Sequence, residues 1–151
     1  MKKILLLIII LFIVTGCNKN DFTVTEFLDT ADFNGYITSE DKKGYEDYDY
    51  IDNVYYAFNR DAEYFIQLLI LNNGDYAKQF FLLNREDIAK LQDNNCYVKS
   101  KNYSNYNLYH LENDESYKLI IQAYNKIIYI DAPIGYINEI EEFLSELKLE
   151  Y

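Results

Sequence analysis

Residues 105–131 read NYNLYHLENDESYKLIIQAYNKIIYID, and their pattern predicts how the central sheet is built. It contains three strand-like segments, which are 105–111, 117–124 and 127–131. Two short turns, Asn113 to Glu115 and Asn125-Lys126, separate the segments. Turns this short join antiparallel neighbours, because parallel strands need a long crossover connection. The stretch therefore predicts an antiparallel sheet, which Pro133 and Gly135 bring to an end.

Two more strands are expected upstream of this stretch. In the first, Val54, Tyr56 and Phe58 alternate with their neighbours. The second, Tyr64 to Leu71, is apolar on both faces, which is typical of a central strand. Asn72-Asn73-Gly74-Asp75 then leaves two alternatives open. Asn-Gly favours a hairpin, whereas helical spacing of apolar residues favours a helix over 75–92 capped by Asp75, and we adopt the helix.

Two further helices flank the strands. Thr23 and Glu26 form a capping-box pattern, with Phe22 and Phe27 in the positions of the hydrophobic staple. Asn34-Gly35 is a C-terminal stop for this helix. The last helix is expected over 134–149, with an acidic outer face.

The predicted order is α-β-β-α-β-β-β-α, an α+β fold in which helices pack on one face of an antiparallel sheet. Residues 23–151 are expected to form a single domain. It should hold one core, made by Phe27, Leu28, Ile66, Leu68, Phe81, Ile121, Phe143 and Leu147.

The N-terminus has the organisation of a signal peptide. Met1-Lys2-Lys3 is a positive segment, and Ile4 to Val14 is an unbroken apolar run of 11 residues. A membrane-spanning helix needs about 20 such residues, so the run fits the apolar part of a signal peptide better.

The next four residues, Val14-Thr15-Gly16-Cys17, resemble the lipobox of bacterial lipoproteins. The resemblance implies diacylglycerol on the Cys17 sulfur and cleavage between Gly16 and Cys17. Residues 1–16 would then be the signal peptide, and 17–22 a lipidated N-terminus with a short tether. Two acyl chains hold a protein stably, so we expect a lipid-anchored protein on the extracytoplasmic face of the cell membrane.

The composition excludes several classes of protein. The 151 residues include 14 Lys+Arg and 25 Asp+Glu, giving a formal net charge of −11. Nucleic acid is therefore excluded as a partner, because phosphate binding needs clustered basic residues. Loss of Lys2 and Lys3 with the signal peptide leaves 12 basic residues against 25 acidic ones, a charge of −13. We expect anionic lipid to repel such a domain, leaving the lipid on Cys17 as its attachment.

The mature part resembles a group of small lipoproteins of clostridial-type Gram-positive bacteria that have no assigned activity. The resemblance rests on the following residues: Phe22-Thr23, Glu26-Phe27, Ala31, Gly35-Tyr36, Ala77, Phe81, Asn84, Asn102-Tyr103, Tyr117, Ile127-Ile128-Tyr129 and Leu147-Lys148-Leu149-Glu150-Tyr151. These are mostly apolar and Gly positions, so the resemblance concerns the fold and transfers no catalytic residue. The chain departs from the pattern near Gln122 to Lys126, where an Arg and an Asn-Thr pair would be expected.

Two sets of residues are candidates for chemistry. Cys96 and His110 could form a nucleophile and base if the fold brings them together. The acidic loop 40–52 could bind a cation, but Ile51 occupies a position where a calcium loop needs an oxygen ligand. We therefore expect no metal and no cofactor.

Two classes of function follow. The first is a monomeric, non-enzymatic binding module of the cell envelope, whose 17 Tyr could contact an envelope protein or a glycan. The alternative is a small exported enzyme that uses Cys96/His110 or an acidic pair. The distance between the Cys96 sulfur and the His110 ring separates the two.

Overall fold

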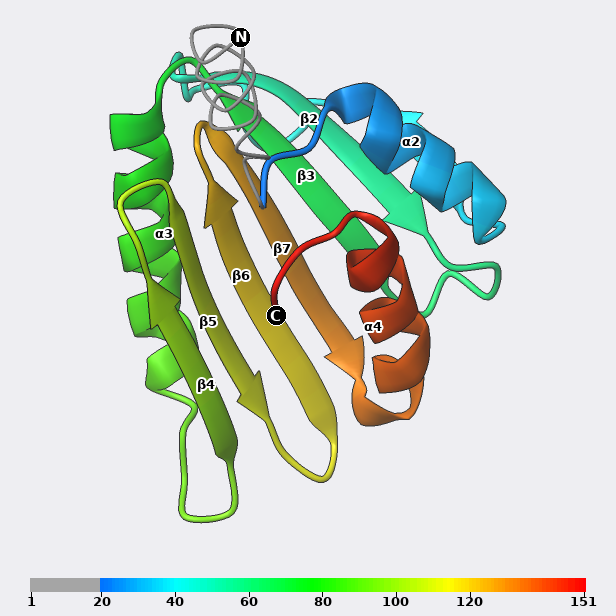
Figure 1. The fold of residues 1–151 in the computed structure, drawn as a ribbon, viewed down its shortest axis with the longest axis vertical. Helices are drawn as coiled ribbons and strands as arrows, with labels where there is room; N and C mark the ends of the chain where they lie inside the picture. Colours follow the sequence, from blue (N-terminus) through cyan, green and yellow to red (C-terminus); the bar gives the residue numbers. More distant parts are fainter. Residues whose placement is uncertain (1–19) are drawn as a thin grey trace, which may run out of the picture.

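A computed structural model describes residues 20–151, and its strands form one antiparallel sheet (Figure 1). The strands are β1 (Ile37–Glu40), β2 (Ile51–Phe58), β3 (Phe65–Leu71), β4 (Tyr97–Asn102), β5 (Tyr106–Glu112), β6 (Ser116–Ala123) and β7 (Lys126–Pro133). Their spatial order is β1-β2-β3-β7-β6-β5-β4. The helices are α2 (Val24–Phe33), α3 (Gly74–Ala89) and α4 (Ile137–Glu146), with a 3₁₀ turn η1 (Ile134–Tyr136) before α4.

The α+β class and the antiparallel sheet are confirmed, and the order of elements differs by two strands. The described residues run α-β-β-β-α-β-β-β-β-α, with β1 and β4 as the additions. Both are edge strands. All four residues of β1 are exposed, and β4 carries Lys99 and Lys101. Neither strand has the apolar alternation that marks a half-buried strand.

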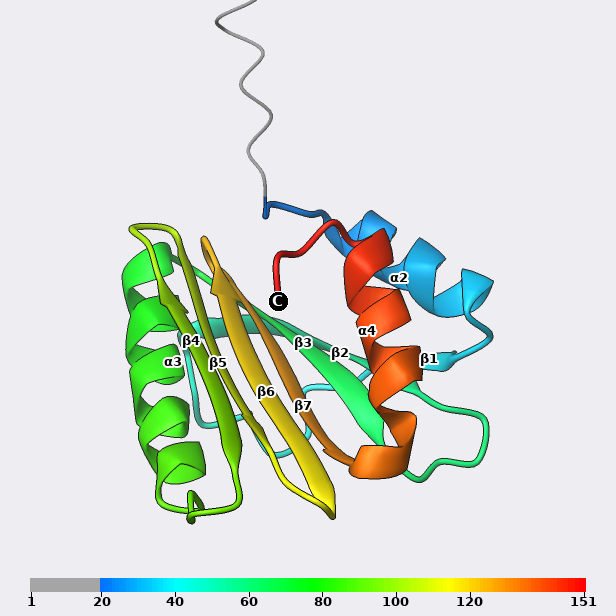
Figure 2. The ribbon, with the colours of Figure 1, turned by 60° about the horizontal axis from the view of Figure 1, so that its bottom comes forward.

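Helices cover both faces of the sheet, so the expectation of helices on one face was wrong. One buried cluster joins the sheet to α2 and α4 and defines the α4 face; the other joins it to α3 and defines the α3 face. Figure 2 shows α3 on one side of the sheet and α2 with α4 on the other. The physical reason lies in strands such as β3, where Leu68 faces α4 and Leu69 faces α3. A strand that is apolar on both faces needs cover on both.

The expected single core is consequently two cores. Phe27, Ile66, Leu68, Ile121, Phe143 and Leu147 lie in the cluster of the α4 face. Phe81 lies in the separate cluster of the α3 face. Leu28 is half-buried and packs against the α4-face cluster. Side chains alternate between the faces of a strand, so the sheet itself divides the two cores.

The local signals around α2 are confirmed. The Thr23 side chain accepts from the backbone N–H of Glu26, and the Glu26 carboxylate accepts from the backbone N–H of Thr23. Phe22 and Phe27 are both buried in the α4-face cluster. Asn34 is the C-cap, and Gly35 follows with φ +73°, in the left-handed region that only Gly adopts readily. Local chemistry therefore sets both ends of this helix.

The helix alternative for residues 75–92 is confirmed and the hairpin is wrong. The N-cap of α3 is Asn73, whose side chain accepts from the backbone N–H of Tyr76, while Asp75 lies in the first turn. The helix ends at Ala89 rather than at residue 92. α4 likewise is shorter than the expected 134–149, because its first residues form η1 and its last residues form a tail.

The C-terminal tail after α4 returns across the α4 face of the sheet. Lys99 Nζ donates to the carbonyl of Tyr151, and Tyr106 Oη donates to the carbonyl of Glu150. The signal peptide, the cleavage point and the lipid site at Cys17 lie outside the described residues. None of the helices in the described part is long and apolar enough to cross a membrane.

Candidate functional site

The structure does not bring Cys96 and His110 together. Cys96 packs against the α3-face cluster. The His110 ring contacts that of Tyr117, a residue of the α4-face cluster, with centroids 4.6 Å apart. The two side chains therefore lie on opposite faces of the sheet. The Cys96 sulfur donates instead to Asp93 at 3.3 Å, so this pair cannot act as a nucleophile and its base.

His110 itself is a buried polar group. It lies on β5 between the rings of Tyr97 and Tyr117, and its Nε2 has no hydrogen-bond partner among residues 20–151. Burial, together with the nearby Lys99 ammonium, lowers the pKa of His110 to about 4. The Glu112 carboxylate, 3.5 Å from Nε2, acts in the opposite direction from a more exposed position. The imidazole is therefore neutral at physiological pH and packs as an aromatic side chain.

The acidic loop 40–52 holds no convergent set of ligands. Within residues 20–151, no three His, Cys, Asp or Glu side chains are grouped as a metal ion would require. The carboxylates of Asp41, Glu46, Asp47, Asp49 and Asp52 are exposed. Asp41 and Glu46 accept hydrogen bonds from backbone N–H groups within the loop. The loop thus presents charge to solvent.

The Tyr residues of this loop begin a continuous aromatic surface, which we call the aromatic band. Ring centroids are 6.1 Å apart for Tyr45 and Tyr48, 5.6 Å for Tyr48 and Tyr50, and 5.2 Å for Tyr50 and Tyr76. The Tyr50 and Tyr76 rings are stacked, so the band reaches from the loop to the first turn of α3.

A hydrogen-bonded bridge extends the band across the sheet. Tyr45 Oη donates to Gln67 Oε1 at 3.2 Å, and Gln67 Nε2 donates to Tyr56 Oη at 3.0 Å. The Tyr56, Phe58 and Phe65 rings contact one another in turn, at 5.4–5.8 Å between centroids. The complete band is Tyr45, Tyr48, Tyr50, Tyr56, Phe58, Phe65 and Tyr76.

The band remains accessible because of where α3 lies. α3 packs mainly over β5, β6 and β7, also contacts β3, and leaves β1 and β2 largely uncovered on this face. Phe65, Tyr48 and Tyr76 are all more than a third exposed. Ile37 of β1, which pairs with Phe58 and so shares its face, is 64% exposed. These residues are scattered along the sequence, and only the strand pairing shows that they form one surface.

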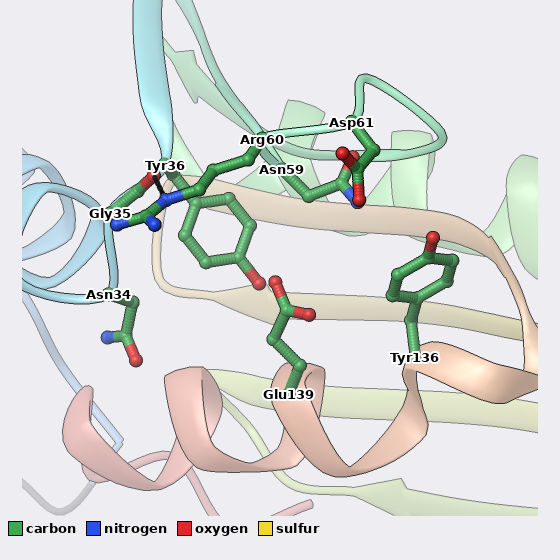
Figure 3. A pocket seen from close by; sticks show the side chains of 8 residues that line it. All are labelled: Asn34, Gly35, Tyr36, Asn59, Arg60, Asp61, Tyr136 and Glu139. Carbon is green, nitrogen blue, oxygen red and sulfur yellow. Dashed lines mark hydrogen bonds between the residues drawn. The ribbon is translucent and has the colours of Figure 1, made fainter.

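A second candidate is a pocket of about 270 Å³ where the end of α2, the β2–β3 turn and the start of α4 meet (Figure 3). It is lined by Asn34, Gly35, Tyr36, Asn59, Arg60, Asp61, Tyr136 and Glu139. In Figure 3 the Arg60 guanidinium lies against Gly35, where its Nε donates to the carbonyl at 3.4 Å. The Glu139 carboxylate points toward the Tyr36 hydroxyl.

The walls of this pocket are largely occupied by partners within the protein. Asn34 Nδ2 donates to the Thr30 carbonyl at 2.8 Å and to Glu146 at 2.6 Å. Asn59 Oδ1 accepts from the backbone N–H groups of Glu63 and Tyr64. The hydroxyls of Tyr36 and Tyr64 are 2.5 Å apart, and burial raises the pKa of both. The polar groups of the pocket therefore mainly hold three structural elements together, whereas the aromatic band leaves several of its rings exposed.

Comparison with known proteins identifies the N-terminus. Residues 1–18 match the prokaryotic membrane lipoprotein lipid attachment site, and Cys17 is the cysteine in that range. None of the curated proteins and none of the solved structures that were compared with the chain matches it. The resemblance of the mature part to clostridial-type lipoproteins therefore stays a prediction. The chain is a lipid-anchored prokaryotic membrane lipoprotein, held at the outer face of the membrane.

Proposed function

We propose that the domain is a non-enzymatic binding module of the cell envelope, and that its aromatic band holds a Lys- or Arg-bearing segment of an envelope protein. The observation that supports this function is the accessible aromatic surface beside an acidic loop. Contiguous exposed apolar surface of this kind is typical of interaction sites. Aromatic residues are also enriched in protein interfaces, where Tyr contributes both apolar area and a hydroxyl.

Charge favours a basic partner. Residues 40–52 contain six carboxylates and two Lys, and their Tyr45, Tyr48 and Tyr50 belong to the band. A Lys or Arg side chain of a partner could stack on these rings while its charge meets the carboxylates. The acidic loop would also steer a basic partner toward the band during encounter.

The form of the enzyme hypothesis that uses Cys96 and His110 is weakened, because these side chains lie on opposite faces of the sheet. A glycan remains the competing ligand for the band, since sugar rings also stack on Tyr. The experiment must therefore separate a protein partner from a glycan.

Site-specific photocrosslinking in the bacterial envelope provides this separation. A benzophenone side chain replaces Phe65 in the band or, as the matched control, Phe33, which is 80% exposed at the end of α2. We expect the chain carrying the Phe65 replacement to crosslink to a protein through a segment rich in Lys or Arg, identified by mass spectrometry. Crosslinks to glycan, equal crosslinks at both positions, or no crosslink at Phe65 would each contradict the proposal.

A further inference from the structure

The chain enters the described domain at a point that limits which end can lie near the membrane. Asn20 is the third residue after Cys17, so a fully extended backbone allows about 11 Å between their Cα atoms. Asn20 lines a surface pocket together with Tyr103, Tyr106, Tyr124 and others. The end of the domain beside Asn20 must therefore lie close to the lipid headgroups.

Two turns form this end of the domain. Residues 103–105 join β4 to β5, and residues 124–125 join β6 to β7. The backbone N–H of Tyr124 donates to the Asn105 carbonyl at 2.8 Å, which holds the turns together. Figure 2 shows both turns at the side of the molecule where the chain enters. We call this surface the anchor end.

The anchor end has the side chains of a membrane interface. Tyr103 is 58% exposed and Tyr124 is half-buried. Tyr is enriched where proteins meet the headgroup region, because its ring favours the apolar side and its hydroxyl favours water.

The charge of the anchor end differs from that of the whole domain. Lys126 pairs with Asp21 at 2.8 Å, and Lys101 lies 3.7 Å from the Glu150 carboxylate. Asp75 and Lys78 line the neighbouring pocket and contribute one negative and one positive charge. This end is thus near neutral, in a mature chain that carries −13 in total. Repulsion from anionic lipid is weakest here.

We propose that the anchor end contacts the bilayer surface through Tyr103 and Tyr124. The strands then lie roughly perpendicular to the membrane, and the C-terminal end of β4 is its membrane-proximal end. The contact orients a domain that its lipid already holds and does not replace the lipid. It rests on lipid attachment at Cys17 and is independent of the proposed partner of the aromatic band.

The test uses Trp fluorescence, because the chain contains no Trp of its own. Tyr103→Trp and Tyr97→Trp place a single Trp at the two ends of β4, about 20 Å apart along the strand. The two positions are matched in exposure, at 58% and 57%. The mature lipidated protein is reconstituted into vesicles of phospholipid brominated near the headgroup, and into unbrominated vesicles for reference.

We expect Tyr103→Trp to lose most of its fluorescence in brominated vesicles and Tyr97→Trp to keep nearly all of it. Tyr124→Trp provides a second reporter in the other turn and should follow Tyr103→Trp. Equal quenching at Tyr97 and Tyr103 would mean that the sheet lies flat on the membrane. Absence of quenching at both turns would mean that the domain stands away from the lipid, and either result overturns the proposal.

Discussion

Asn20 Oδ1 accepts a hydrogen bond from the backbone N–H of Glu150 at 2.9 Å, so the first described residue is joined to the C-terminal tail. Lys99 and Tyr106 hold the same tail against the sheet through the carbonyls of Tyr151 and Glu150. The C-terminal tail is thus part of the surface at which the N-terminal segment enters the domain. The tail therefore connects the sheet to the end of the chain that carries the lipid.

Asn20→Ala should loosen the tail. Loss of one hydrogen bond costs about 1 kcal/mol, and the amides of the tail should exchange with solvent faster. Hydrogen exchange followed by mass spectrometry on peptides covering residues 147–151 measures this. Asn138→Ala, on the exposed surface of α4, is the control and should leave the tail unchanged. Unchanged exchange in Asn20→Ala would show that the other contacts suffice.

Thr23→Ala should destabilise the domain through the N-terminus of α2. The substitution removes the Oγ that accepts from the Glu26 N–H, and loss of such a cap costs about 1 kcal/mol. Thr25→Ala, at an exposed position inside the same helix, should be neutral or slightly stabilising, because Ala has the higher helix propensity. Urea denaturation of both variants gives the comparison. Equal effects would mean that the capping box does not determine stability.

The features that the sequence predicted well are local ones. The capping box of Thr23 and Glu26 and the stop at Gly35 depend on residues within a few positions of one another. The antiparallel order of β5, β6 and β7 follows from two short turns. Such features need no knowledge of the remainder of the fold.

The features that the sequence failed to predict depend on distant partners. β1 is exposed along its whole length and is a strand only because β2 pairs with it. The assignment of Phe81 to its own core required knowing which face of the sheet α3 covers. Residues 64–71 are apolar on both faces of the strand, and this pattern by itself predicts that helices cover both faces of the sheet. The aromatic band unites a loop, two strands and a helix, so no periodicity in the sequence shows it.

The two cores should behave as independent units. Phe81→Leu and Phe143→Leu lie on opposite faces of the sheet, and each should cost about 1–2 kcal/mol. Their effects should add within about 0.5 kcal/mol, as distant sites do. Phe27 and Phe143 have ring centroids 5.5 Å apart, so Phe27→Leu with Phe143→Leu is the control and should deviate from additivity. Coupling between Phe81 and Phe143 of the same size as in this control would contradict the division into two cores.

His110 should make stability depend on pH below neutrality. Its pKa is lowered to about 4 in the folded protein, so the unfolded chain takes up the proton first as the pH falls. The contribution of this pKa shift to the free energy of unfolding is fully present above the ordinary His pKa of about 6.5. It decreases as the pH falls toward 4, by about 3 kcal/mol in total.

Unfolding free energies of the protein and of His110→Leu, measured between pH 4 and pH 7, test this dependence. Carboxylates titrate in both proteins, so the difference between the two curves isolates the histidine. We expect the protein to lose more stability than the variant over this range. Parallel curves would show that His110 can be protonated in the folded state without cost.

The mass of the protein extracted from bacterial membranes tests lipid anchoring at Cys17 directly. Lipid anchoring at Cys17 predicts a chain of 135 residues that begins at Cys17 and carries a diacylglyceryl group on its sulfur. Cys17→Ser should lose the lipid and leave the membrane. A mature chain that begins at any other residue, or a lipid that persists in Cys17→Ser, would contradict lipid anchoring at Cys17.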